Sequence, residues 1–239
     1  MMKNTASYKV LALCALSLAT AAPAFADDFE FSGNAGFVSE YSFRGIAQSD
    51  EHPALQGGFD VSHSSGLYAG VWGSNIDFND GDQAALEVDG YLGYSNDYEG
   101  LNYDIGAIYY AYPGADSSLD YDFVEFALAL GYDFDVAAAS VSVNYSPEYF
   151  GNSGHAEYYA AGVDVPLPAD LSLSAHIGWQ EIEHNTVFGV PDYMDWSVGL
   201  GYSFKGFDLS LSYIDTDLSK SECADGCDSK IIFGISRSF

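Results

Sequence analysis

Apolar and polar residues alternate strictly along many segments of this chain. Residues 171–179 run Leu, Ser, Leu, Ser, Ala, His, Ile, Gly and Trp, and residues 207–213 and 195–203 keep the same period of two. Successive side chains of a β-strand point to opposite faces of its sheet, so this pattern predicts strands with one apolar and one polar face. The chain is therefore expected to be all-β.

Twelve such segments follow one another along the chain. They lie at residues 29–43, 54–63, 66–77, 84–95, 100–111, 120–132, 135–146, 155–165, 170–180, 193–204, 206–216 and 229–239. Most are close to the roughly 9–11 residues that a tilted strand needs to cross a bilayer. An even number of strands also brings both ends of a barrel to the same side, as bacterial outer-membrane barrels require.

The connections between the segments alternate in length. Short turns at residues 64–65, 96–99, 133–134, 166–169 and 205 separate longer loops at residues 44–53, 78–83, 112–119, 147–154, 181–192 and 217–228. Membrane barrels have short periplasmic turns and longer extracellular loops. The sequence therefore predicts a transmembrane, antiparallel up-and-down β-barrel of about 12 strands.

The polar face decides between this barrel and a soluble one. A soluble β-sandwich or lipocalin-like barrel also alternates, but its apolar face points inward and needs bulky packing partners. Here Gly, Ser, Asp and Asn fill the polar phase, which suits contact with water. Aromatic residues gather near the segment ends, as in the interfacial girdles of membrane barrels: Phe29, Phe31, Tyr94, Tyr109, Tyr132, Tyr145, Trp179, Trp196 and Phe204.

The first residues carry the pattern of a secretory signal peptide. Lys3 and Lys9 precede an apolar run from Val10 to Ala22, and residues 24–26 read Ala-Phe-Ala, the small-x-small pattern of a cleavage site. We expect a signal peptide at residues 1–26 and a barrel domain at residues 27–239. The expected location is the bacterial outer membrane.

The charge of the mature chain excludes one class of partner. Cleavage removes two lysines from the 7 basic residues and none of the 35 acidic ones, which leaves a net charge of −30. Nucleic-acid binding needs a basic surface, so a nucleic-acid partner is excluded. An aromatic content of 16% argues against disorder as the cause of this acidity.

The polar phase places fourteen hydrogen-bonding side chains in the interior, nine of them carboxylates. They are Glu30, Asn34, Asp60, Glu87, Asp89, Asn102, Asp104, Glu125, Asn144, Asp164, His176, Gln180, Asp195 and Asp208. A water-filled lumen with one sign of charge concentrates counter-ions and repels co-ions. The pattern favours a cation-preferring diffusion pathway, and the alternative is a narrow, closed barrel whose carboxylates pair with Ser, Tyr and water.

Arg44 stands where the first segment meets its loop and is the only basic residue between Lys9 and Lys205. One interpretation gives it a role in selectivity at the pore mouth. The other is a structural ion pair with a loop carboxylate, Asp50 or Glu51, since paired charges at a barrel end need no special function.

Cys223 and Cys227 are the two cysteines of the mature chain. A spacing of three intervening residues without a nearby His is poor for zinc. Disulfides persist beyond the inner membrane, so we expect a small disulfide that closes a loop.

Residues 77–82, with four acidic or amide positions and a Gly, resemble a calcium loop. Gly81 falls one place early for an EF-hand, and Val88 stands where the last ligand, a Glu, belongs. A turn built on Asp80 and Gly81 is the favoured interpretation.

Ser153, His155 and Glu157 lie close in sequence and were considered as a catalytic set at the barrel rim. No Gly-x-Ser-x-Gly motif or metalloprotease helix accompanies them. We therefore expect a loop without catalysis, and no enzyme, metal site or cofactor in this chain.

The first hairpins resemble a known family. Residues 32–48, 53–60 and 66–75, with the strings Tyr-Ser-Phe-Arg-Gly and Gln-Gly-Gly-Phe-Asp, are similar to the TorF family of proteobacterial porins. The close match covers residues 32–77, and the remainder is similar in pattern and length. The resemblance implies an outer-membrane barrel of the porin kind and implies no substrate.

Together these features predict a channel for passive diffusion of small neutral or cationic solutes. The expected partners are outer-membrane lipids, lipopolysaccharide and the barrel-assembly machinery, since the terminal Phe239 resembles the assembly signal of such barrels. The alternative function is a closed surface barrel that acts in adhesion, binding or structure.

Overall fold

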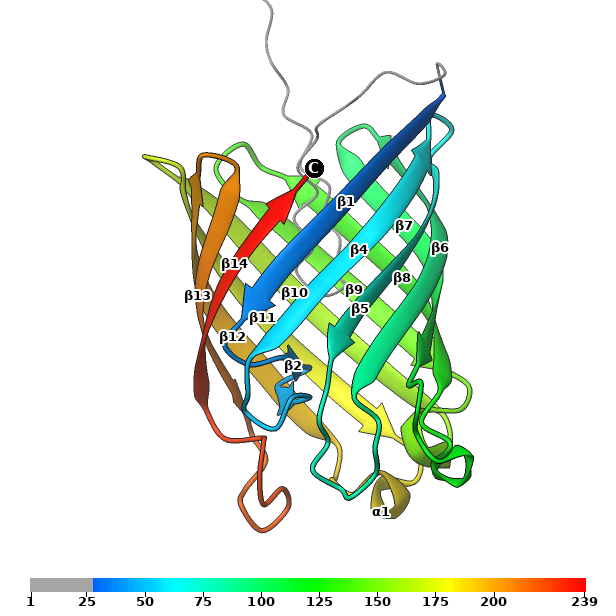
Figure 1. The fold of residues 1–239 in the computed structure, drawn as a ribbon. Helices are drawn as coiled ribbons and strands as arrows, with labels where there is room; N and C mark the ends of the chain where they lie inside the picture. Colours follow the sequence, from blue (N-terminus) through cyan, green and yellow to red (C-terminus); the bar gives the residue numbers. More distant parts are fainter. Residues whose placement is uncertain (1–27) are drawn as a thin grey trace, which may run out of the picture.

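Twelve antiparallel strands close into one barrel in the computed structural model, which describes residues 28–239 (Figure 1). The expected signal peptide and its cleavage site lie outside the described residues. The barrel strands are β1 (Phe29–Val38), β4 (Ala54–His63), β5 (Leu67–Asn75), β6 (Leu86–Tyr98), β7 (Leu101–Ala111), β8 (Phe123–Asp133), β9 (Ala138–Ser146), β10 (Ala156–Leu167), β11 (Leu171–Ile182), β12 (Tyr193–Phe204), β13 (Phe207–Thr216) and β14 (Lys230–Ser238).

The barrel closes where β1 pairs with β14, and every other pair joins barrel strands that are consecutive in the chain. Phe239 and Gly33 exchange two backbone hydrogen bonds of 2.9 Å at this seam. The predicted all-β, up-and-down barrel is therefore confirmed. Closure leaves no unpaired strand edge, which a structure in lipid cannot tolerate because lipid offers no hydrogen bonds.

The two ends of the barrel differ. Short turns and the C-terminus lie at one end, here named the turn end, and the long connections lie at the other, named the loop end (Figure 1). The loop end carries two short 3-10 helices, Ser117–Leu119 and Phe150–Asn152, and the helix α1 (Asn185–Phe188). Of the helices in residues 28–239, none is long and apolar enough to cross a membrane.

The first predicted strand is wrong in its last five residues, 39–43. Residues 29–43 were expected as one strand, but β1 ends at Val38. The chain then turns into the barrel and forms a small hairpin of β2 (Ser42–Phe43) and β3 (Ile46–Ala47), whose turn places Arg44 at φ 48° and Gly45 at φ 82°. We call residues 39–53 the inner loop. Apolar and polar residues still alternate in this segment because the hairpin also has two faces. Both faces contact protein, whereas one face of a barrel strand contacts lipid.

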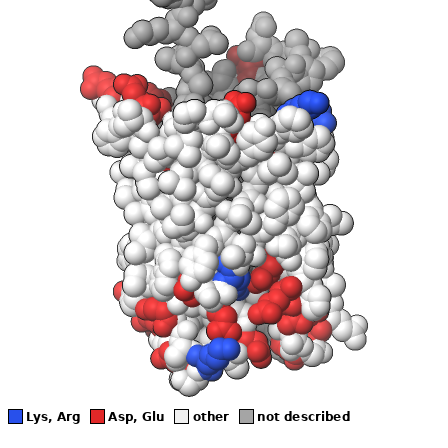
Figure 2. Space-filling view, turned by 90° about the vertical axis from the view of Figure 1, so that its left-hand side faces the viewer, with Lys and Arg blue, Asp and Glu red and all other residues white. Residues whose placement is uncertain are grey.

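The outside of the barrel is an apolar belt. The exposed fraction is 70% for Leu55, 65% for Leu92, 65% for Phe59 and 68% for Ile231. On the face seen in Figure 2, acidic and basic residues gather at the two ends and leave a belt of other residues between them. A soluble protein rarely exposes a continuous apolar surface of this extent, so the belt is suited to lipid.

Candidate functional site: the barrel interior

An aromatic cluster fills the interior at the loop end. Tyr41 of the inner loop packs edge-on against Trp72 of β5 at 5.6 Å between ring centroids, and Phe43 packs against Tyr110 of β7 at 5.9 Å. These contacts attach the inner loop to one side of the wall, at β5 and β7. The buried members of the cluster are Tyr41, Ala54, Trp72, Ile76, Ala84, Ile108, Tyr110, Tyr112, Phe123, Tyr149, Ala156 and Ile182.

Arg44 lies at the tip of the hairpin and forms a buried ion pair inside the barrel. Its Nη2 is 2.7 Å from Oε2 of Glu125 on β8, and the exposed fractions of the two side chains are 6% and 2%. Its Nη1 donates a hydrogen bond of 2.8 Å to Gln180 of β11. The guanidinium also lies 4.1 Å from the ring centroid of Tyr158. The cation therefore joins the inner loop to two strands at distant points of the wall.

This position corrects the expected ion pair of Arg44. Neither Asp50 nor Glu51 is its partner: Asp50 Oδ1 accepts a hydrogen bond of 3.2 Å from Asn79 instead. The reason is the inward turn of the hairpin, which directs Arg44 away from its own loop and toward Glu125. Arg44 is thus buried in the interior and does not stand at an open mouth.

The predicted lining residues divide by burial. Six of them are at most 6% exposed, namely Glu87, Asp89, Asp104, Glu125, Asn144 and Asp195. Asp60, Asn102, His176 and Asp208 are half-buried, and Asp164 is exposed. All occupy the strand phase opposite to the exposed apolar residues, as the period of two requires. The deep carboxylates are therefore buried among protein groups and do not line open water.

Tyrosine hydroxyls pair with most of these carboxylates. Tyr41 donates to Glu87 at 2.6 Å, and Tyr68 donates to Asp104 at 2.9 Å. Tyr91 donates to Asp60 in the same way. Neutral donors of this kind stabilise a buried carboxylate without cancelling its charge. The interior therefore holds more carboxyl groups than its two buried basic side chains, Arg44 and Lys230, can pair with.

A second cluster joins three residues on the opposite wall. The hydroxyl of Tyr158 lies 2.9 Å from Oδ2 of Asp195 and 2.9 Å from Nε2 of His176. His176 is also 3.3 Å from Oδ1 of Asp195. Sequence reasoning placed His176 and Asp195 in the interior but missed Tyr158, whose inward phase was available from the alternation of β10.

Two tyrosine rings lie flat on the inner wall over glycines of the neighbouring strand. A Cβ on Gly93 would stand 2.4 Å from the hydroxyl oxygen of Tyr68, and a Cβ on Gly70 would stand 2.5 Å from the ring of Tyr91. Glycine is required at both positions because any side chain would occupy the space of a ring. The rings thereby leave more room along the barrel axis.

Small residues line the interior toward the turn end on the wall formed by β9–β14. Asp164 is exposed there, and no residue that surrounds it belongs to the buried aromatic cluster. Side chains of one or two heavy atoms do not reach across a barrel of twelve strands. The inward positions of this half include Ser140, Ser142, Gly162, Ser172, Ser174, Ser197, Gly201, Ser210, Ser212 and Ser236.

Two carboxylate oxygens in the interior have no hydrogen-bond partner from the protein. They are Oδ1 of Asp89 and Oδ2 of Asp104. A buried, unpaired carboxylate oxygen is costly unless water or a cation approaches it. Residues 28–239 contain no group of three or more side chains arranged to hold a metal ion. The carboxyl groups are therefore spread along the interior.

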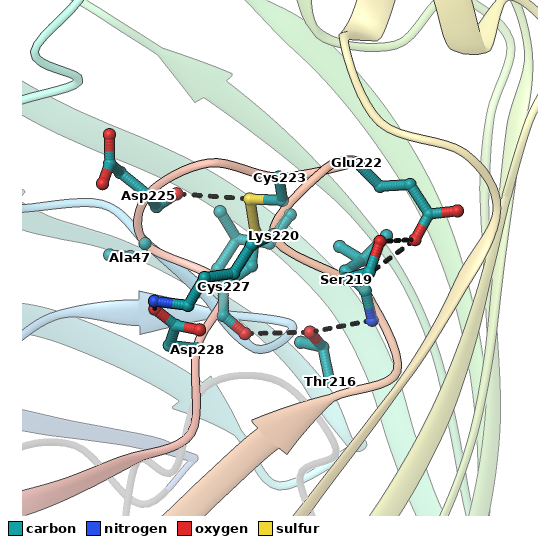
Figure 3. The surroundings of a disulfide bond; sticks show 12 residues. Ala47, Thr216, Ser219, Lys220, Glu222, Cys223, Asp225, Cys227 and Asp228 are labelled. Carbon is teal, nitrogen blue, oxygen red and sulfur yellow. Dashed lines mark hydrogen bonds and ion pairs between the residues drawn. A yellow bond between two sulfur atoms is a disulfide. The ribbon is translucent and has the colours of Figure 1, made fainter.

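At the loop end, Cys223 and Cys227 form a disulfide (Figure 3). It closes a small ring within the last outer loop, residues 217–229. Cys227 is 2% exposed, and its carbonyl oxygen accepts a hydrogen bond of 2.9 Å from the hydroxyl of Thr216 at the end of β13. The ring is thus fixed to the wall of the barrel.

The segment at residues 77–82 forms consecutive side-chain turns. Asp77 Oδ1 accepts from the backbone N–H of Asn79, and Asp80 Oδ1 accepts from that of Asp82, both at 2.9 Å. These carboxylates serve the backbone of their own loop, which is the turn that the sequence favoured over a calcium loop.

The three residues considered as a catalytic set do not form one. The ring Nδ1 of His155 lies 2.8 Å from Oε2 of Glu183, while Ser153 Oγ is buried and has no hydrogen-bond partner. Hydrogen bonds from the backbone N–H and then the ring of His155 lower the pKa of Glu183 below its ordinary value. The pair therefore ties two outer connections together.

Solved structures with a similar fold are outer-membrane proteins. The chain aligns with a KdgM porin at a TM-score of 0.60 and 8% identity, covering 87% of this chain and 99% of that one. A NanC porin gives 0.57 and 11% identity over 87% and 98% of the two chains. The COG4313 outer membrane channel from Pseudomonas putida F1 gives 0.53 and 10% over 90% and 97%. At these identities the likeness shows the fold alone.

Sequence comparisons give a family without a known function. No curated protein matches the chain. The resemblance of residues 32–77 to the TorF family stays a prediction. A family sequence model described as a bacterial protein of unknown function, Gcw_chp, matches residues 21–239. The chain therefore belongs to the Gcw_chp family.

Proposed function

We propose that this protein is an outer-membrane channel for passive diffusion of small solutes, with a preference for cations. The observation that carries the proposal is the contrast between the two halves of the interior. The wall of β9–β14 has small polar side chains toward the turn end, whereas the loop end is filled by an aromatic cluster to which the strands, their connections and the inner loop all contribute.

An outer-membrane location is supported by three features. The exterior is an apolar belt with charged ends (Figure 2), the connections alternate between short and long, and the barrel has no free edge. These are the properties of bacterial outer-membrane barrels. The similar structures carry the names porin and outer membrane channel, which agrees with this location.

The inner loop is the element that controls passage in this proposal. It enters the barrel as a short hairpin and is attached by side chains and by a few backbone hydrogen bonds, such as that of 2.9 Å from Asp77 N–H to the Gln48 carbonyl. Its displacement would break no hydrogen bond between barrel strands. In this proposal the structure is the closed form of a channel, and the wall of the barrel stays intact when the inner loop moves.

The cation preference rests on charge. The nine carboxylates that the sequence placed inward lie in the inner strand phase, whereas the two buried basic side chains, Arg44 and Lys230, are each paired with a carboxylate. In a narrow, low-dielectric passage a surplus of one sign raises the local concentration of counter-ions. Small cations are accordingly favoured over anions of the same size.

The test is single-channel conductance in a planar bilayer under a salt gradient. Wild-type protein is expected to give discrete steps with a reversal potential of the sign for cations. Asp164→Asn should reduce this preference, since Asp164 is exposed in the interior, whereas Glu87 is buried and already paired. Asp225→Asn, which removes the same charge from an exposed outer loop, is the matched control and should leave the preference unchanged.

A closed surface barrel is the second candidate, and the filled loop end is the observation that favours it. Folded protein without conductance above background, in the wild type and in a variant with the inner loop shortened, would support this candidate. Conductance with an anion preference would keep the channel and overturn the role of the carboxylates.

A further inference from the structure

The ring closed by Cys223 and Cys227 touches the inner loop through backbone groups (Figure 3). Gly226, which lies between the two cysteines, accepts a hydrogen bond of 2.8 Å at its carbonyl oxygen from the backbone N–H of Ala47 on β3. A Cβ on Gly226 would stand 3.2 Å from the Cβ of Ala47, and its φ of +81° favours glycine. The ring therefore approaches the hairpin as closely as two backbones allow.

Lys230 adds a second attachment at the same carbonyl. Its Nζ donates to the Gly226 oxygen at 2.7 Å and forms an ion pair of 2.8 Å with Glu40, at the start of the inner loop. The side chains of Lys230 and Glu40 are only 9% and 11% exposed. Charge-assisted hydrogen bonds of this kind orient their groups, and loss of one partner would leave the other charge buried and unpaired.

Three polar attachments hold the inner loop in addition to the Tyr41–Glu87 hydrogen bond and the backbone contact with Asp77. Arg44 pairs with Glu125 at the hairpin tip, Glu40 pairs with Lys230 at the start of β14, and Ala47 bonds to Gly226 of the last outer connection. Two of the three attachments share one carbonyl oxygen. The position of that oxygen depends on the ring, because Thr216 fixes the ring at Cys227 and the disulfide fixes the path from Cys223 to Cys227.

We propose that the Cys223–Cys227 ring is a redox-sensitive latch that keeps the inner loop inside the barrel. This inference rests on the proposed function for its effect on passage, but the latch itself concerns only the position of the loop. A dithiol reductant supplies two electrons and two protons: the S–S bond breaks, two thiols form, and the dithiol becomes a cyclic disulfide. The freed segment no longer fixes the Gly226 carbonyl, so the hairpin detaches at Ala47 and Lys230 loses the acceptor that orients it toward Glu40.

Hydrogen exchange measured by mass spectrometry tests the latch without reference to conductance. Folded wild-type protein is compared before and after treatment with dithiothreitol, and peptides that cover residues 39–53 are followed. Exchange there should accelerate by roughly tenfold or more, while the strands of the seam, β1 and β14, stay protected. Gly226→Ala keeps the disulfide and should produce the same acceleration without reductant.

Two controls separate the latch from general loosening. In Cys223→Ser/Cys227→Ser, reductant should have no further effect on residues 39–53. Lys220→Met removes an exposed ion pair with Asp228 from the same loop and should leave exchange unchanged.

Conductance of the same samples separates the latch from the channel. Faster exchange together with a higher open fraction supports both proposals. Faster exchange without any conductance keeps the latch and overturns the channel. Unchanged exchange in residues 39–53 after complete reduction, shown by thiol titration, overturns the latch whether or not the protein conducts.

Discussion

Removal of the Arg44 side-chain charge is the sharpest test of how the inner loop is held. In Arg44→Met, Glu125 keeps a buried negative charge, 2% exposed at its side chain, and loses the cation 2.7 Å away. Tyr110 and Asn144 still donate to the same oxygen at 3.3 and 3.2 Å. Breaking a buried ion pair from one side costs about 3–5 kcal/mol, and the two remaining donors place the expected cost near the lower limit.

This free-energy cost can be observed in two ways, and each has its own measurement. The loop can stay in place, so that the free energy of unfolding falls by about 3 kcal/mol, or it can leave the interior, so that conductance rises. Chemical unfolding in micelles, followed by tryptophan fluorescence, measures the first outcome, because Trp72 packs on Tyr41 of the same loop. Planar-bilayer recording measures the second outcome.

Two further variants test whether the buried charge of Glu125 causes the loss of stability. Arg44→Met combined with Glu125→Gln removes the unpaired charge and should recover most of the loss, on the order of 2 kcal/mol. Lys220→Met breaks an ion pair whose side chains are 78% and 53% exposed and should cost less than about 1 kcal/mol. If Arg44→Met matches the wild type in both stability and conductance, the ion pair does not hold the loop.

Two other predictions concern the wall of the barrel. Gly93→Ala should destabilise the protein by roughly 1–3 kcal/mol, because the new Cβ would stand 2.4 Å from the Tyr68 hydroxyl; Gly90→Ala, in the same strand with nothing within 4 Å, should have little effect. Both are measured by urea unfolding, and equal losses would show that the Tyr68 ring moves freely. Leu92→Arg, in the middle of β6 and 65% exposed, should cost about 2–4 kcal/mol in a bilayer, whereas Leu86→Arg at the strand end should cost at most about 1 kcal/mol. Unfolding from liposomes measures the cost of both substitutions. A larger cost for Leu86→Arg than for Leu92→Arg would mean that the centre of the apolar belt lies nearer to Leu86 than to Leu92.

The number and order of the barrel strands were predictable from the sequence because each strand faces two different environments. Apolar residues such as Leu173 and Ile177 face outward, and polar ones such as Ser174 and His176 face inward. The two environments therefore produce a sequence pattern with a period of two residues. The one serious error, at residues 39–43, has the same physical origin. A hairpin that packs inside a barrel also has two faces, so its local sequence pattern is the same as that of a strand that spans the membrane.

The partners inside the barrel could not be predicted in this way. Arg44 pairs with Glu125, 81 residues further along the chain, and Gln180 is 136 residues away. Alternation assigns each side chain to a face but says nothing about its height on the wall or about a loop that folds back. The depth of Glu87 and Asp89, and hence their burial, follows from that loop and not from their own strands.

The attachment points of the inner loop also set an order of events during folding. Its contacts reach β5, β6, β8, β11 and the start of β14, so they come from almost the whole circumference. Contacts between residues so distant in sequence are entropically costly until the chain between them is already ordered. The wall must therefore close before the loop has its complete set of partners, so the inner loop is the last part of the barrel to reach its final position.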